Sequence, residues 1–206
     1  MNGLFPRFRN VTLDTYQPQD PSQKEALRVV KDYIDHIDDA RITGFGLTLI
    51  GPAGVGKTHL ATAVLKHAGA IPNLVYTKDY DEPLDTGPRY RVDSIATSDF
   101  VALHQKVLSD EEAANRVERI ERHLSFVLFD DLGREYNSDR DFASNVMFHA
   151  IKNRYNRQRP FLITTNHDLD WLKERYTEGF TSLLVGTTRI IEIDGKDHRA
   201  SRPARD

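Results

Sequence analysis

The fold of this chain is decided by the stretch Gly51-Pro52-Ala53-Gly54-Val55-Gly56-Lys57-Thr58. An apolar run over residues 45–50 precedes it, and His59 begins the helical-looking segment 59–65 that follows. This order of strand, glycine loop and helix is the setting that a P-loop requires. Glycines let backbone N–H groups surround a phosphate without a Cβ in the way, and the helix adds its positive N-terminal end. We therefore predict that residues 51–59 bind the phosphates of ATP or ADP.

The last two residues of the loop have specific expected roles. Lys57 would reach the β- and γ-phosphates as a catalytic residue, and the Thr58 hydroxyl would ligate Mg²⁺. The alternative is a glycine-rich turn that binds nothing. Because every fixed position of the motif is filled between a strand and a helix, the sequence favours the nucleotide site. The predicted cofactors are ATP or ADP with Mg²⁺.

Composition limits the class of protein. The 206 residues carry a net charge of −3, with 39% hydrophobic and 29% charged residues, which is typical of one globular domain. This charge provides no general attraction to nucleic acid, so any DNA contact requires a local patch. The chain has no cysteine, which excludes disulfides and thiolate metal sites. The first residues lack the apolar segment of a signal peptide, and no apolar run approaches the ~20 residues of a membrane span, so we expect a cytoplasmic protein without membrane contact.

A second apolar run, residues 124–129, ends in two acids, Asp130 and Asp131. Such a run predicts a buried parallel strand, whose carboxyl end faces the ligand crevice of an open α/β sheet. Adjacent carboxylates repel each other unless a cation offsets them. We therefore assign Asp130 to the Mg²⁺ shell and Asp131 to activation of the attacking water. The alternative is that Asp131 only supports a turn.

Asn166 follows another predicted buried strand, residues 161–165. It would lie beside the two acids, where its amide could hold the lytic water or touch the γ-phosphate. The alternative use is turn chemistry, which is common for asparagine. Asn166 is thus the third predicted catalytic residue, with Lys57 and Asp131.

Caps and apolar spacing predict the remaining elements. Ser22-Gln23-Lys24-Glu25 has the form of a capping box and predicts a helix from Ser22 with Ile37 on its apolar face. Prolines and glycines predict a long loop over 71–89. We further expect a strand over 89–97, a helix capped by Ser98 or Asp99, and an exposed charged helix over 110–123. The next predicted helix is capped by Asn137 or Ser138, and its buried face contains Phe142, Val146, Met147, Ala150, Ile151 and Tyr155. A helix over 168–176 and a strand over 189–193 complete the prediction.

The domain boundaries are predicted from composition. Residues 1–21 form an irregular arm that either packs across the domain or lines a purine pocket, residues 22–195 form the ATPase core, and residues 196–206 form a basic, loosely held tail. A basic cluster, Lys152, Arg154, Arg157 and Arg159, either complements a helix end or faces nucleic acid or a neighbour's phosphate.

These pieces, in this order, resemble the AAA+ ATPases of the DnaC-type helicase-loader group, which includes phage replication proteins and the transposition helper IstB. The residues that carry the resemblance are 10–16 with 21–24, Gly51 to Leu60, Asp130-Asp131-Leu132-Gly133, Ile163-Thr164-Thr165-Asn166, and Ile193-Asp194-Gly195-Lys196-Asp197. The expected fold is α/β, a three-layer P-loop NTPase core of the AAA+ ASCE type with a mostly parallel five-stranded sheet. The resemblance implies a replicative helicase or another replication protein as partner, often around single-stranded DNA.

Three departures from that group affect the expected activity. Almost nothing precedes the core where such loaders carry a helicase-binding region, and the dozen or so residues after the last strand predict no C-terminal helical lid. Leu183 stands where members often have an arginine that reaches a neighbour's ATP. Its loss predicts weak turnover unless Arg175, Arg189 or the 154–159 cluster substitutes.

Two other functions therefore stay open beside that of a Mg²⁺-dependent ATPase acting as a helicase loader. One is a nucleotide-responsive adaptor with little turnover, which Leu183 favours. The other is a transposition helper ATPase. The sequence leaves the oligomeric state and direct DNA binding open.

Overall fold

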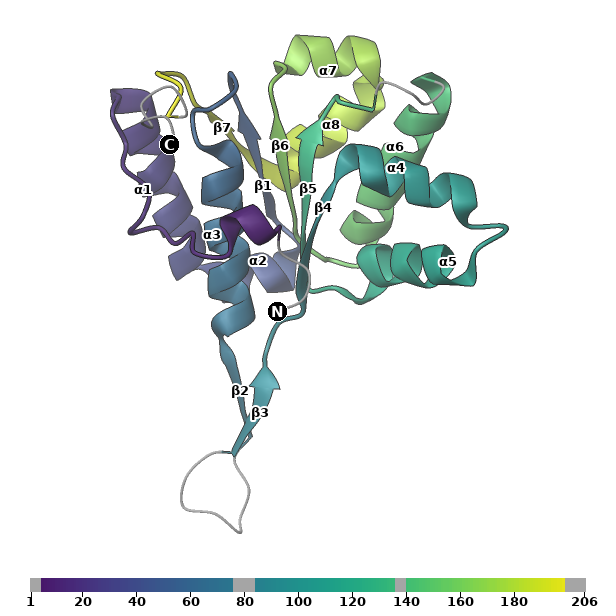
Figure 1. Cartoon of the computed structure of the whole chain (residues 1–206), viewed down its shortest axis with the longest axis horizontal. Coiled ribbons are helices and arrows are strands. Elements are labelled where there is room, and N and C mark those ends of the chain that lie inside the picture. The colour runs from purple at the N-terminus through teal and green to yellow at the C-terminus, as the bar shows by residue number, and fades with distance from the viewer. Residues whose placement is uncertain (1–4, 76–83, 136–139, 199–206) are drawn as a thin grey trace, which may run out of the picture.

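A central sheet of five parallel strands organises the computed structural model, which describes residues 5–75, 84–135 and 140–198. Its strands are β1 (Gly46–Ile50), β4 (Val92–Ala96), β5 (Phe126–Leu132), β6 (Phe161–Thr165) and β7 (Thr188–Glu192), in the spatial order β4-β5-β6-β1-β7. All four neighbouring pairs run parallel. The predicted five-stranded sheet is confirmed (Figure 1).

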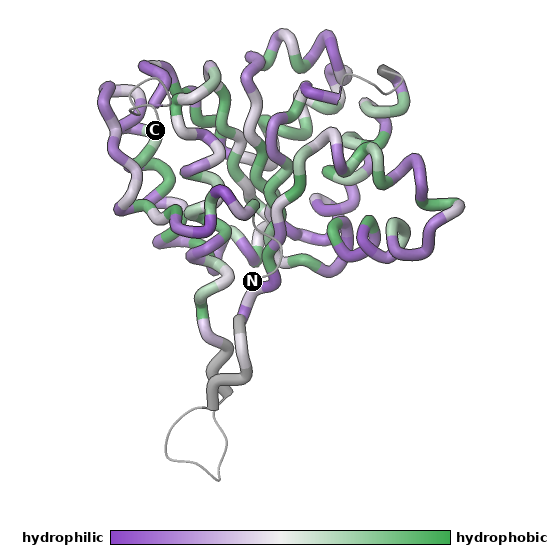
Figure 2. The backbone as a smooth tube through the Cα atoms, in the orientation of Figure 1, coloured by the Kyte–Doolittle hydropathy of each residue, from purple (hydrophilic) through white to green (hydrophobic). Residues whose placement is uncertain are grey.

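Helices cover both faces of the sheet and complete the three layers. One face is covered by α1 (Pro21–Asp35), α2 (Ile37–Thr43) and α3 (Lys57–Ala70), and the other by α4 (Thr97–Lys106), α5 (Glu111–Glu118), α6 (Arg140–Asn156), α7 (Leu169–Arg175) and α8 (Glu178–Thr187) (Figure 1). Successive residues of β5 alternate between the two cores: Leu128 packs with the first set and Phe129 with the second. Figure 2 shows the apolar residues gathered along the strands.

Helix α1 begins one residue earlier than predicted and is not closed by a capping box. Its N-cap is Asp20, without a side-chain cap hydrogen bond. The Ser22 hydroxyl instead donates to the Glu192 carbonyl at 3.3 Å and accepts from the Asp194 N–H at 2.9 Å. Ser22 therefore joins α1 to the end of β7, a long-range role that a local capping pattern cannot reveal. Ile37 lies in α2, separate from α1.

The segment predicted as a loop over 71–89 contains two strands. β2 (Pro72–Val75) and β3 (Leu84–Pro88) pair antiparallel and extend away from the body of the protein (Figure 1). The loop prediction was wrong for these ranges. It took prolines and glycines as signs of a loop, but Pro72, Gly87 and Pro88 lie within the strands. The part over 76–83 lies outside the described residues.

Other boundaries differ from the prediction for identifiable reasons. Helix α4 has Ala96 as its N-cap in place of Ser98 or Asp99, and its first residue, Thr97, donates its hydroxyl to the Asp130 carbonyl at 2.9 Å. Tyr155 of α6 is 51% exposed, not buried. The predicted caps Asn137 and Ser138 lie outside the described residues.

The charged segment after α4 is less exposed than predicted. It forms α5 and a π-helical turn, η2 (Arg119–His123). Its inner face buries Ala113, Val117, Ile120 and Glu121. Within the described residues, no helix is both long enough and apolar enough to cross a membrane.

Candidate nucleotide site

The glycine loop lies between β1 and α3, at the carboxyl end of the sheet. Gly54 and Gly56 have φ angles of +83° and +100°, a region that glycine adopts without strain. Close neighbours also exclude side chains here. A Cβ at Gly54 would lie 1.7 Å from Asp197 Oδ1, and one at Gly56 would lie 2.4 Å from Tyr16 Cε2. The sequence therefore places glycines where both backbone shape and packing require them.

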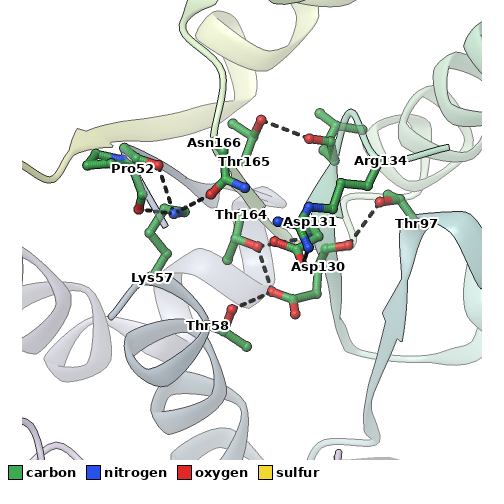
Figure 3. A network of polar contacts seen from close by, with 12 residues as sticks. Pro52, Lys57, Thr58, Thr97, Asp130, Asp131, Arg134, Thr164, Thr165 and Asn166 are labelled. Carbon is green, nitrogen blue, oxygen red and sulfur yellow. Dashed lines mark hydrogen bonds and ion pairs between the residues drawn. The ribbon is translucent and has the colours of Figure 1, made fainter. Parts of the chain in front are cut away.

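Lys57, the first residue of α3, lies across the mouth of this loop. Its Nζ donates to the Gly51 carbonyl at 2.8 Å, to the Pro52 carbonyl at 2.7 Å and to Asn166 Oδ1 at 2.8 Å (Figure 3). The residue is only 5% exposed. These three contacts hold one cationic group between the P-loop and the end of β6, which suits an anion with several oxygens.

Thr58 and Asp130 form the next layer of the site. The Thr58 hydroxyl donates to Asp130 Oδ1 at 2.9 Å, and the Thr164 hydroxyl donates to the same oxygen at 2.5 Å (Figure 3). Burial raises the pKa of Asp130, and the charge of Asp131 acts in the same direction, while the hydroxyl hydrogen bonds oppose them. A hydroxyl and a carboxylate that share a contact are hard oxygen donors, so this pair fits Mg²⁺.

Asp131 is turned away from Asp130 by an irregularity in β5. The register of β5 against β6 shifts between Phe129 and Leu132, and Asp131 has a φ of 57°. Its N–H donates to the Thr164 hydroxyl at 2.9 Å, while its carboxylate lies 3.4 Å from Arg134 Nη1. Such irregularities re-aim side chains near functional sites. Here the two adjacent acids take different positions, one buried and one facing the pocket.

A pocket over the P-loop brings together residues from distant parts of the chain. It includes predicted site residues from the P-loop, β5 and β6, and the N-terminal arm closes one side. The lining residues are Arg7, Phe8, Val11, Ala53, Gly54, Gly56, Lys57, Thr58, His59, Asp131, Arg134, Asn166 and His198. The arm thus lines a pocket beside the P-loop.

The arm is also attached to the P-loop by specific contacts. The Tyr16 hydroxyl donates to the Val55 carbonyl at 3.0 Å, and its ring meets His59 edge-on with 5.3 Å between centroids. Burial raises the pKa of Tyr16 to about 12, so the phenol remains a donor at neutral pH. Tyr16 therefore fixes the outer side of the loop.

Residues 195–198, which we name the C-terminal strap, pack on the other side of the P-loop. The His198 N–H donates to the Gly54 carbonyl at 3.1 Å, and Lys196 N–H donates to Asp20 Oδ2 at 3.1 Å. The Gln23 side chain contacts the Lys196 carbonyl and the His198 ring. The prediction of a loosely held tail is therefore wrong for residues 196–198, because the strap is hydrogen-bonded to the P-loop. Residues 199–206 lie outside the described part of the chain.

The turn after Asp131 contains residues that the sequence analysis missed. Arg134 lines the pocket, and the adjacent Glu135 is 3% exposed. Glu135 accepts hydrogen bonds from the Gly133 N–H at 3.3 Å and from the Tyr176 hydroxyl at 2.8 Å. The only signal in the sequence was the position of both residues just after the acid pair.

The basic cluster predicted over 152–159 does not form one surface. Arg154 is fully buried, and its guanidinium donates to the backbone carbonyls of Ile120, Leu124, Ser125 and Pro160 at 2.5–3.3 Å. It lies at the amino ends of β5 and β6, opposite the nucleotide pocket. Arg154 therefore cannot contact nucleic acid or a neighbour's phosphate, and the prediction was wrong for this residue.

Comparisons with known proteins agree with this geometry. The model of the family described as "ATPase family associated with various cellular activities (AAA)" matches residues 47–185. No curated protein sequence matches the chain significantly. A crystal structure of the DnaC helicase loader has a TM-score of 0.74 and 25% identity, covering 92% of this chain and 99% of its own.

Two further solved structures share the fold at lower identity. A putative primosome component from Streptococcus pyogenes serotype M3 has a TM-score of 0.69 and 18% identity, covering 95% of this chain and 92% of its own. AMPPCP-bound DnaA from Aquifex aeolicus has a TM-score of 0.65 and 19% identity, covering 95% of this chain and 53% of its own. These two show the likeness of fold only.

Proposed function

The chain belongs to the AAA family of ATPases, and we propose that it binds ATP with Mg²⁺ and hydrolyses it as a helicase loader or loader-like factor in DNA replication. The observation that carries the nucleotide chemistry is the convergence of Lys57 with Asn166 and of Thr58 with Asp130 at the carboxyl end of the sheet. Lys57 and Thr58 begin α3, Asp130 lies in β5, and Asn166 directly follows β6. Their direct contacts match the parts that phosphoryl transfer needs.

Each residue has a distinct role in the proposed site. The Gly51–Gly56 loop and Lys57 bind the phosphates, and Thr58 with Asp130 would hold Mg²⁺, which supplies charge neutralisation on the phosphate oxygens. Asp131, which is partly exposed and faces the pocket, accepts the proton of the attacking water. Asn166 keeps Lys57 in place through its Oδ1 and offers its amide N–H₂ to the water or to phosphate. The arm, through Phe8 and Val11, offers apolar contact to the base.

The replication role is supported by similarity to the DnaC helicase loader, which is 25% identical and which this chain matches over nearly its whole length. A replicative helicase is therefore the partner that we propose, with single-stranded DNA as a second candidate. Nucleotide-dependent ordering of the loops at the carboxyl end of the sheet would change the grip on that partner.

A nucleotide-responsive adaptor with little turnover is the second candidate, and one specific observation favours it. Leu183, on α8, is packed against the second hydrophobic core, at the position where the resembling group often has its arginine. The two candidates differ in hydrolysis and agree in nucleotide binding.

Lys57→Ala tests the proposed site by titration calorimetry with ATP and ADP in Mg²⁺. We expect affinity for both to fall about 100-fold or more, since hydrogen bonds to charged groups each contribute about 1.5–3 kcal/mol. Lys31→Ala, an exposed lysine of α1, is the matched control and should bind as the wild type does. Tight binding of ATP by a folded Lys57→Ala variant would show that this loop is not the site.

The replication role is tested separately by recovering the tagged chain from its native host with ATP present. We expect a replicative helicase to accompany the wild type and to be reduced with Lys57→Ala. Recovery without any replication protein would contradict the proposed role and leave the nucleotide site unaffected.

A further inference from the structure

We infer that Arg134 supplies, from the same chain, the cation that contacts the terminal phosphate of a bound nucleoside triphosphate. The inference rests on the proposed function, because it requires a triphosphate in the pocket over the P-loop. Arg134 lines this pocket together with Lys57, Thr58 and Asn166. In Figure 3 its side chain extends from the turn after β5 toward Asp131.

The backbone that carries Arg134 is fixed on both sides. A turn closes when the Arg134 N–H donates to the Asp131 carbonyl at 3.2 Å, and the N–H of Asp131 is itself bonded to Thr164. On the other side, buried Glu135 is held by the Tyr176 hydroxyl and the Gly133 N–H. Position 134 is therefore preorganised at the edge of the pocket, as a charge-stabilising group needs to be.

The guanidinium, in contrast, is held weakly. Its side chain forms an ion pair with the Asp131 carboxylate at 3.4 Å, and the two side chains are 52% and 37% exposed. Ion pairs this exposed contribute little to stability. A terminal phosphate carries more negative charge than one carboxylate and can accept two parallel N–H bonds from a guanidinium. Phosphate would therefore replace Asp131 as the partner of Arg134.

Three of the arginines expected to fill this role are engaged elsewhere. Arg154 is buried at the opposite end of the sheet, and Arg189 donates to Asp32 at 2.8 Å. The Arg175 guanidinium lies over the Tyr176 ring, 5.4 Å from its centroid. None of these three is among the residues that line the pocket. Among the described residues that line the pocket, the arginines are Arg7, on the N-terminal arm, and Arg134, which the turn after β5 holds beside Asp131. With Leu183 at the position of the neighbour-directed arginine, Arg134 is the arginine next to the acid pair that can act within one chain.

This exchange couples phosphate binding to the state of Asp131. When Arg134 moves to the phosphate, the Asp131 carboxylate loses this ion pair and is left facing the pocket. A diphosphate lacks the oxygens that draw Arg134 away. The site therefore distinguishes ATP from ADP without a residue from a second subunit.

The test compares wild type, Arg134→Ala and Arg134→Lys in calorimetric binding of ATP and ADP, and in single-turnover ATP hydrolysis. For Arg134→Ala we expect unchanged ADP affinity, ATP affinity lowered about 10- to 100-fold, and hydrolysis slowed about 1,000-fold, the lower end of the range for arginine fingers. Arg134→Lys keeps the charge without the paired N–H groups, so it should fall between the two.

Arg122→Ala is the matched control, because Arg122 also forms a 3.4 Å exposed ion pair, with Glu118, far from the pocket. It should behave as the wild type does. If Arg134→Ala binds and hydrolyses ATP like the wild type, the inference is overturned while the proposed function stands. Equal loss of ADP and ATP affinity would assign Arg134 a structural role and also overturn the inference. If the wild type binds neither nucleotide, the proposed function itself fails.

Discussion

Each end of the parallel sheet contains an arginine, and the two arginines differ in exposure and in hydrogen bonding. At the carboxyl end, Arg134 is half exposed and has a loose 3.4 Å ion pair with Asp131. At the amino end, Arg154 has no exposed surface and donates to four backbone carbonyls. The first arrangement can be exchanged for a ligand at little cost, whereas the second cannot.

This difference separates charges that build the fold from charges that serve the site. Arg154 donates to backbone carbonyls just before β5 and β6, where buried carbonyls need hydrogen-bond donors. Burial lowers the pKa of Arg154, the nearby charges of Arg159 and Arg41 act in the same direction, and the charge of Glu121 opposes them. The geometry therefore assigns a structural role to the arginine at the amino end, and the proposed function places the chemistry at the carboxyl end.

We expect the largest effect from Arg154→Met, which tests the structural role of the arginine at the amino end. We expect the free energy of unfolding to fall by about 3 kcal/mol, because several buried carbonyls lose their charged donor at once. Urea unfolding followed by circular dichroism would measure it. Arg157→Met is the matched control: Arg157 is exposed on the same segment, so its loss should change stability by less than about 0.5 kcal/mol. Equal stability of the two variants would contradict the structural role.

Asp130→Asn tests the carboxyl end of the sheet, where the proposed function requires a buried charge that lowers stability. The folded-state pKa of Asp130 is raised by burial and by Asp131, so its ionised form costs stability at every pH above that raised value. At pH 7 the Asn variant should therefore have a higher Tm by a few degrees, since about 1 kcal/mol shifts Tm by about 2–4 °C in a domain of this size.

The difference in Tm between the wild type and Asp130→Asn should depend on pH. As the pH falls through the raised pKa, wild-type Asp130 becomes neutral and the advantage of Asn should disappear. Thermal unfolding at pH 7 and pH 4 measures both values, and Mg²⁺-dependent hydrolysis should be lost at either pH. A lower Tm for Asp130→Asn at pH 7 would show that the charge stabilises the fold.

The P-loop and the acid pair could be predicted because each is a local pattern whose position in the fold follows from strand order. The burial of Arg154 could have been predicted from the helical period, but its charge led to the prediction of a surface position. It lies three residues after Ile151 and four after Ala150, both fully buried, so the helical period places it on the buried face of α6. The charge of the residue suggested a surface, and the period was the better guide.

The contacts around the loop could not be predicted from local patterns. Gln23 meets the C-terminal strap across 173 or more residues of sequence, and Ser22 meets Asp194 across 172. Such pairs depend on the completed sheet, which brings the end of β7 beside α1. The same holds for Tyr16 and Arg134, whose positions beside the P-loop follow from packing and from a turn at positive φ.

We propose that the carboxyl end of the sheet hydrolyses ATP through Asp131, and the direct test is single-turnover hydrolysis by Asp131→Asn. Asparagine tolerates the φ of 57° at this position and keeps the turn, but it cannot accept a proton from water. We expect unchanged ADP affinity and a hydrolysis rate lowered by about 10²- to 10⁴-fold. A variant that hydrolyses bound ATP at the wild-type rate would contradict it.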